Sequence, residues 1–186
     1  MRHAASSAGD ALLRLYQQLA DDVRIRSPRC SASGRCCKFE SWGHRLYVTG
    51  FETAYLWARL AMPQRPGVQA VLDSRAAGGC PFQPERLCTV HTLRPLGCRI
   101  FFCDETATAW QEETYERYQR EVRSLHDIHQ IPYVYAEWRA LLETLAASAV
   151  SRSWPVIAAE PGPANTGLPG SVSISIHGSP PRDVPS

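Results

Sequence analysis

The sequence predicts a single, mainly helical domain in which two irregular cysteine-rich loops are held between helices, followed by a disordered tail. Three observations predict this fold. Apolar residues recur at helical spacing in several segments, the cysteines gather in two loop-like clusters, and the composition changes abruptly near residue 151. The domain is expected over residues 10–150 and the tail over residues 152–186. A chain of 186 residues is long enough to bury a core without covalent cross-links.

The first half of the chain predicts three helices. Residues 10–26 carry apolar side chains at a spacing of three and four, and Ser27-Pro28 ends that helix. Thr49 and Glu52 have the spacing of a capping box, which starts a helix that runs to about Met62. A shorter helix is expected over residues 67–75, and a short strand or an extended connector over residues 39–48.

The second half predicts two further helices. Residues 105–129 contain no Gly or Pro and carry an apolar seam, which is typical of a long amphipathic helix. Pro132 is expected to open the last helix, with Trp138 facing inward. Residues 80–104 contain several prolines and should be mostly irregular. Residues 152–186 are rich in Pro, Gly and Ser without periodicity, so a disordered tail is expected there.

Charge and hydropathy limit the classes of partner. The chain has 20 basic and 18 acidic residues, and this balance gives no argument for nucleic-acid binding. No stretch approaches the ~20 apolar residues of a membrane span, and the first residues do not have the pattern of a signal peptide. We therefore expect a cytoplasmic protein with no membrane partner.

The cysteines indicate a metal site. All seven lie between residues 30 and 103; six form two clusters with Gly, Pro and Arg between them, and Cys103 follows just beyond the second cluster. Free thiols persist in a reducing cytosol, and an odd number cannot pair completely, so ligation is favoured over disulfides. Thiolates are strong ligands for zinc, iron and iron–sulfur clusters, so a metal ion is the expected partner. The candidate ligands are Cys30, Cys36, Cys37, Cys80, Cys88, Cys98 and Cys103.

Neighbouring residues add to this hypothesis. The adjacent Cys36 and Cys37 would point to opposite sides of an extended backbone, which favours two metal atoms or a multi-iron cluster. So many thiolates would leave excess negative charge, and six cationic residues lie among them. Arg94 and Arg99 are expected to donate hydrogen bonds to sulfur or to bind an anionic substrate; the alternative is that they are ordinary surface cations. The six are Arg29, Arg35, Lys38, Arg86, Arg94 and Arg99.

The histidines give a weaker signal. His44 and His91 lie close to the clusters, and either could complete a mixed Cys/His site, although a hydrogen-bonding or packing role is favoured for each. His126 and His129 are expected on the solvated face of the long helix, outside the site. No phosphate-binding loop, nucleophile elbow or His-Glu-x-x-His helix is present in the sequence.

The cysteine pattern resembles the YkgJ-type cysteine-cluster family, which is described as a zinc- or iron-chelating domain with a CxxCxxCC motif. The resemblance covers residues 30–103 and rests on Cys30, Cys36-Cys37, Cys80-Pro81-Phe82, Cys88, Arg94-Pro95, Cys98-Arg99 and Cys103. Ser33 stands at the position of the second family cysteine, and His91 stands where an aromatic residue is usual. The resemblance implies that one metal would take an oxygen ligand or keep an open position.

The expected function is metal binding with a structural or redox-linked role, and a non-catalytic protein is favoured over an enzyme. Two alternatives stay open. The resemblance implies a metal-dependent or iron-cluster-dependent protein-modifying enzyme similar to flagellin lysine N-methylase. A metal-ordered adaptor or chaperone would use the same site to shape a surface for a protein partner.

Overall fold

A computed structural model describes residues 2–30 and 33–150 of the chain. It confirms a mainly helical fold built from six α-helices, several short 3-10 helices and one pair of short strands within these residues. The predicted tail, residues 152–186, lies outside the described residues.

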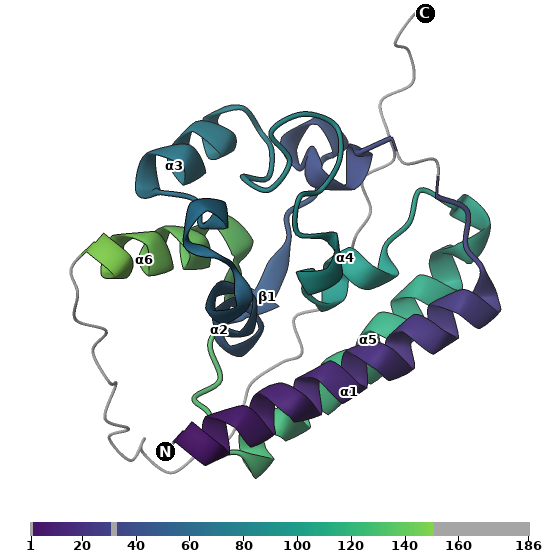
Figure 1. Cartoon of the computed structure of the whole chain (residues 1–186). Helices are drawn as coiled ribbons and strands as arrows, with labels where there is room; N and C mark the ends of the chain where they lie inside the picture. Colours follow the sequence, from purple (N-terminus) through teal and green to yellow (C-terminus); the bar gives the residue numbers. More distant parts are fainter. Residues whose placement is uncertain (1, 31–32, 151–186) are drawn as a thin grey trace, which may run out of the picture.

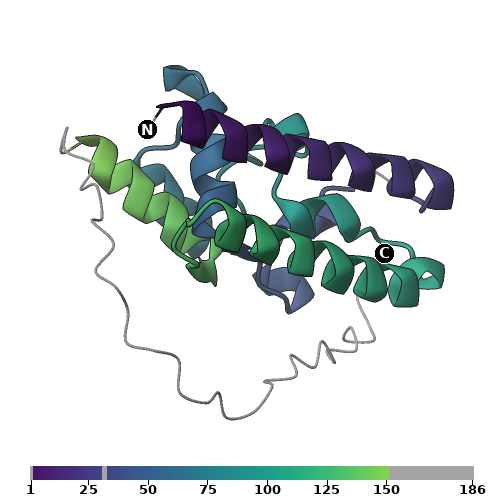
Figure 2. The same ribbon diagram turned by 90° about the horizontal axis from the view of Figure 1, so that it is seen from below.

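The two long helices lie side by side and run in opposite directions (Figures 1 and 2). They are α1 (Arg2–Arg26) and α5 (Thr108–Ile128), and their apolar faces share one buried cluster. Tyr118 Oη donates to Asp22 Oδ2 over 2.8 Å at the edge of this contact. Helix α1 begins well before the predicted residue 10, because the preceding Ala-rich residues favour a helix even without an apolar seam.

The predicted capping box is present. Thr49 Oγ1 accepts a hydrogen bond from Glu52 N at the start of α2 (Gly50–Arg59), and Glu52 Oε2 accepts one from Thr49 N over 3.0 Å. The helix ends at Arg59, slightly before the predicted Met62. Helix α3 (Val68–Ala76) agrees with the predicted short helix over residues 67–75.

A two-stranded antiparallel ladder joins β1 (Tyr47–Thr49) to β2 (Tyr135–Glu137), with Val48 opposite Ala136. The last helix, α6 (Trp138–Val150), therefore begins at Trp138, and the prediction that Pro132 opens it is wrong. Backbone bonds at both ends of the ladder, Gly50 N to Val134 O and Trp138 N to Leu46 O, explain the difference, since both depend on a segment remote in sequence.

The second cysteine segment is less irregular than predicted. It contains a 3-10 turn over His91–Leu93 and the short helix α4 (Leu96–Ile100). The first backbone N–H of α4, on Leu96, donates to the buried Glu52 Oε1 over 2.8 Å. This tertiary hydrogen bond fixes the start of α4 and is not visible in the local sequence. Further 3-10 turns cover Arg35–Cys37, Glu40–Trp42, Met62–Gln64 and Glu105–Ala107.

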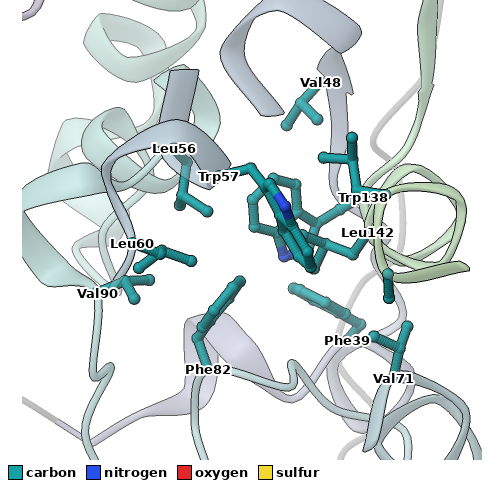
Figure 3. Close-up of a cluster of buried hydrophobic side chains, with 12 residues drawn as sticks. Phe39, Val48, Leu56, Trp57, Leu60, Val71, Phe82, Val90, Trp138 and Leu142 are labelled. Carbon is teal, nitrogen blue, oxygen red and sulfur yellow. The ribbon is translucent and has the colours of Figure 1, made fainter. Parts of the chain in front are cut away.

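A second hydrophobic cluster lies where the two cysteine segments meet α2 and α6. Figure 3 shows the rings of Trp57, Trp138, Phe39 and Phe82 at its centre. Trp138 is buried, as predicted from its place in the apolar pattern. Cys80 and Cys88 are partly buried and pack against this cluster, so the candidate ligands lie beside a rigid core.

None of the helices in the described ranges combines the length and the apolarity that crossing a membrane requires.

Candidate metal centre

Five of the seven cysteines come together between the two cysteine segments. The first segment contributes Cys36 and Cys37 from the 3-10 turn over Arg35–Cys37. The second contributes Cys80, Cys88 and Cys98. The Cys37 thiol is hydrogen-bonded with both Cys36 and Cys80, and Cys88 and Cys98 lie within electrostatic range of Cys36 and Cys80. We call these five residues the cysteine cluster.

One glycine and one glutamine hold the two segments together. Gly34 precedes the 3-10 turn with a φ of 74°, a left-handed conformation that favours glycine. Gln83 Nε2 donates to Gly34 O over 2.9 Å and to Arg86 O over 2.7 Å, so one side-chain amide joins the first segment to the second. A Cβ atom at Gly34 would collide with Gln83 Nε2 and with Arg86 O. The approach of the two cysteine segments thus requires a glycine here.

The last helix supplies two polar groups beside the cluster. Arg139 is buried and donates to Glu40 Oε1 over 2.8 Å, to Glu137 Oε1 over 2.8 Å and to Gly79 O over 3.3 Å. These bonds fix the backbone immediately before Cys80 against the first cysteine segment. The guanidinium charge of Arg139 also favours a thiolate at Cys80.

The Trp138 indole N–H is the second of these groups. Its Nε1 is buried and has no hydrogen-bond partner of normal geometry among the described residues. The indole still interacts with Cys80 closely enough to lower the pKa of that thiol. A thiolate or a metal-bound sulfur at Cys80 would satisfy this otherwise orphaned donor.

Hydrogen bonding separates the pKa values of the three contacting thiols. The hydrogen bond with Cys37 lowers the pKa of Cys36 to about 6, and the charge of Arg94 acts in the same direction. The hydrogen bond with Cys37 also lowers the pKa of Cys80. The pKa of Cys37 itself is raised by these same hydrogen bonds with Cys36 and Cys80. These opposite shifts make Cys37 the last of the three thiols to lose its proton.

The other two members of the cluster are held mainly in the thiol form. Burial raises the pKa of Cys88 and of Cys98, and the nearby Cys80 adds to both effects. Arg94 opposes the rise at both positions. Its charge thus reaches Cys36, Cys88 and Cys98, in agreement with a position just outside the candidate ligands.

Cys30 and Cys103 lie elsewhere. Both are exposed, and neither has a hydrogen bond or an electrostatic interaction with the cysteine cluster within the described part of the chain. Arg29 N donates to Asp104 Oδ2 over 2.9 Å, which brings the residue before Cys30 beside the residue after Cys103. The structure therefore divides the seven sequence candidates into a cluster of five and two outlying cysteines.

The remaining sequence candidates have other contacts. His44 Nε2 lies 3.4 Å from Cys36 O, and its ring packs edge-on against Phe39. Ser33 Oγ accepts a weak hydrogen bond from Arg35 N at 3.5 Å. His91 is exposed, and partial burial of its ring lowers its pKa. None of these side chains contacts a cluster sulfur in the residues that the structure covers.

One predicted environment was wrong. His126 is buried rather than solvated, with Nδ1 3.2 Å from Ile131 O and the ring packed edge-on against Phe51. This difference arises from tertiary packing that the spacing of the residues does not encode. Arg99 donates to the backbone carbonyls Arg94 O over 2.6 Å and Thr92 O over 2.7 Å, and its expected role in binding an anion stays a prediction.

The thiol side chains of the cluster are suitable ligands for a thiophilic ion, but their present arrangement is not that of a metal site. Within residues 2–30 and 33–150, no three His, Cys, Asp or Glu side chains are arranged so that they could hold a metal ion. The Cys37 thiol instead interacts with the thiols of Cys36 and Cys80. Ligation would require loss of the proton on Cys37 and rotation of these short side chains, while the indole of Trp138 already lowers the pKa of Cys80.

Comparison of the chain with models of known protein families, with curated proteins and with solved structures finds no match.

Proposed function

We propose that this protein binds zinc or iron through the cysteine cluster. The convergence of Cys36 and Cys37 from one segment with Cys80, Cys88 and Cys98 from another supports this proposal more than any other observation. Five thiols exceed the four ligands of a structural zinc site, so an iron–sulfur cluster or a second ion also suits this donor set. The proposed role is structural or redox-linked.

The chain's own residues would prepare the thiolates. Arg94 and Arg139 place positive charge near the sulfurs, and the Trp138 indole offers a hydrogen bond to Cys80. A bound ion would supply a cross-link between the two segments and, for iron, an electron-accepting centre. A cytoplasmic location is part of the proposal, because free thiols persist in a reducing compartment.

The relationship to the YkgJ-type family remains a prediction from the cysteine pattern. The five clustered cysteines all belong to that pattern, which is consistent with the proposal. The modifying-enzyme and adaptor alternatives receive no specific support from the described residues.

Anaerobic purification followed by elemental analysis and absorption spectroscopy tests the proposal. We expect at least one zinc or iron per chain, and visible absorption in the case of an iron–sulfur cluster. Cys37→Ala and Cys98→Ala should reduce the metal content to less than half, because each removes a cluster sulfur. A folded, metal-free wild-type protein under these conditions would refute the proposal.

Cys103→Ala is the matched control, since it removes an exposed cysteine outside the cluster. We expect its metal content to equal that of the wild type. If Cys103→Ala loses metal as completely as Cys37→Ala, the assignment to five residues is wrong and all seven cysteines take part.

A further inference from the structure

A small pocket lies between α1 and α4, which are neighbours in Figure 1. Its volume is about 110 Å³. Leu19 and Val23 of α1 and Phe102, just after α4, give it apolar walls, and Arg94 and Arg99 also line it. No acidic side chain is among its lining residues.

The two arginines are fixed in place but have no carboxylate partner. Arg99 lies with its guanidinium carbon 4.1 Å from the centre of the Tyr16 ring, and its Nε and Nη2 donate to backbone carbonyls. Arg94 Nε donates to His91 O over 3.0 Å, and its two Nη groups make no hydrogen bond within the described ranges. Neither residue forms an ion pair with any acidic group there.

The larger pocket at the C-terminal end of α1 differs in this respect. Its volume is about 330 Å³, and Asp22 and Arg117 in its wall are paired with each other. Arg26 also lines that pocket and donates to Thr106 O, so one of its two arginines is paired with a carboxylate, whereas neither arginine of the smaller pocket is. In the smaller pocket two partly buried guanidinium groups face apolar walls, and such groups are stable when an anion completes their hydrogen bonds.

We propose that the pocket between α1 and α4 binds a small organic carboxylate. The carboxylate would accept hydrogen bonds from Arg94 and Arg99, and a short alkyl group would lie against Leu19, Val23 and Phe102. A cavity of about 150 Å³ accommodates benzene, so this smaller space suits a short-chain acid. A tetrahedral phosphate fits less well, because the apolar walls would leave some of its oxygens unpaired.

This inference goes beyond the proposed metal binding and does not depend on it. The ligand would lie beside the cysteine cluster, since Arg99 follows Cys98 in α4 and the charge of Arg94 reaches the cluster sulfurs. The pocket itself contains no cysteine. Carboxylate binding and metal content can therefore be measured separately on the same preparation.

Titration of the full-length protein with butyrate, followed by NMR at constant ionic strength, tests this proposal. We expect saturable binding that is tighter than that of acetate and of inorganic phosphate. Arg99→Gln and Arg94→Gln should each weaken butyrate binding by roughly ten- to one hundredfold, because each removes a charged hydrogen-bond donor.

Arg86→Gln is the matched control. Arg86 is an exposed residue of the second cysteine segment that does not line the pocket, so its variant should bind butyrate like the wild type. If Arg99→Gln does not fold, as circular dichroism would show, Arg94→Gln decides the outcome. Absence of saturation, tighter binding of phosphate than of butyrate, or equal effects of Arg86→Gln and Arg94→Gln would overturn the proposal.

Discussion

The Glu52 carboxylate joins three elements of the fold through four hydrogen bonds. It is almost completely buried, at 2% exposure. Oε1 accepts from Tyr16 Oη of α1 and from Leu96 N of α4, and Oε2 accepts from N and Oγ1 of Thr49. The capping box was predictable from two residues three positions apart. The bonds to Tyr16 and Leu96 were not, because these residues are remote in sequence.

We expect Glu52→Gln to lower the free energy of unfolding by about 3 kcal/mol. The glutamine NH₂ group would face groups that also donate hydrogen bonds. The hydrogen bonds that remain would have a neutral amide oxygen as acceptor instead of a charged carboxylate oxygen. Urea unfolding followed by circular dichroism measures the change. Glu112→Gln, on the exposed face of α5, is the control and should change the stability little. Equal stabilities of the two variants would contradict this account of Glu52.

Asp104 should make the stability depend on pH in the acidic range. Its carboxylate accepts hydrogen bonds from Arg29 N and from Thr106, and these hold its pKa at about 2, below the ordinary value of about 3.9. A lowered pKa in the folded state means that the carboxylate stabilises the fold above pH ~4. That contribution is lost as the pH falls from about 4 to about 2.

The matched variant is Asp104→Asn, which cannot titrate. We expect the wild type to have the higher melting temperature at pH 7 and the difference to shrink progressively between pH 4 and pH 2. Thermal unfolding at a series of pH values measures this. A difference that stays constant over the whole range would show that the charge of Asp104 does not contribute.

At the scale of elements, the contact between the two cysteine segments depends on Gly34. Gly34 and Gly43 both have positive φ values, 74° and 64°, but only Gly34 meets other atoms where a Cβ would lie. Gly43→Ala should therefore cost only the left-handed strain, about 1 to 2 kcal/mol. Gly34→Ala adds a collision with Gln83 and with the backbone of Arg86, so it should be clearly less stable and bind less metal.

Thermal unfolding and elemental analysis of the two glycine variants provide the comparison. If Gly34→Ala and Gly43→Ala prove equal in stability and in metal content, the two segments do not need their close approach at Gly34.

Elements with a local signal were predicted well, and those with a remote partner were not. The apolar seam of α5 and the start of α2 depend on neighbouring residues. Strand β2 exists because β1, almost ninety residues earlier in the chain, offers its backbone groups. Local preference after Pro132 favours a helix, and this pairing replaces the expected first turns with a strand.

At the scale of the whole molecule, metal binding should stabilise the fold as a unit. Both cysteine segments pack against the core that α2 and α6 share, so a ligand that joins them binds the folded state in preference to the unfolded one. Free metal at one hundred times its dissociation constant should add about 2.7 kcal/mol, or roughly 5 to 10 °C in melting temperature. Removal of the metal by a chelator should reverse the shift in the wild type.

Cys37→Ala is the control for this linkage and should show little response to added metal or to chelator. An unchanged wild-type melting temperature across a metal titration would contradict the coupling between ligation and folding.

The sequence indicated which residues carry the chemistry of the candidate site but not how they are supported. Cysteine spacing predicted that two segments approach each other, and five of the seven cysteines lie near one another between them. Arg139 and Trp138 could not be assigned to it, because Arg139 lies 99 positions after its partner Glu40. The separation of Cys30 and Cys103 from the cluster likewise follows from the Arg29–Asp104 contact, which spacing does not reveal.

The position of Trp138 and Arg139 at the start of the last described helix has a consequence for biosynthesis. While the protein is being translated, all five cluster cysteines leave the ribosome before the indole and the guanidinium that act on Cys80. A nascent chain therefore exposes unsupported thiols until residue 139 has emerged. Protection of these thiols from oxidation during synthesis would then depend on the speed with which the final helix docks.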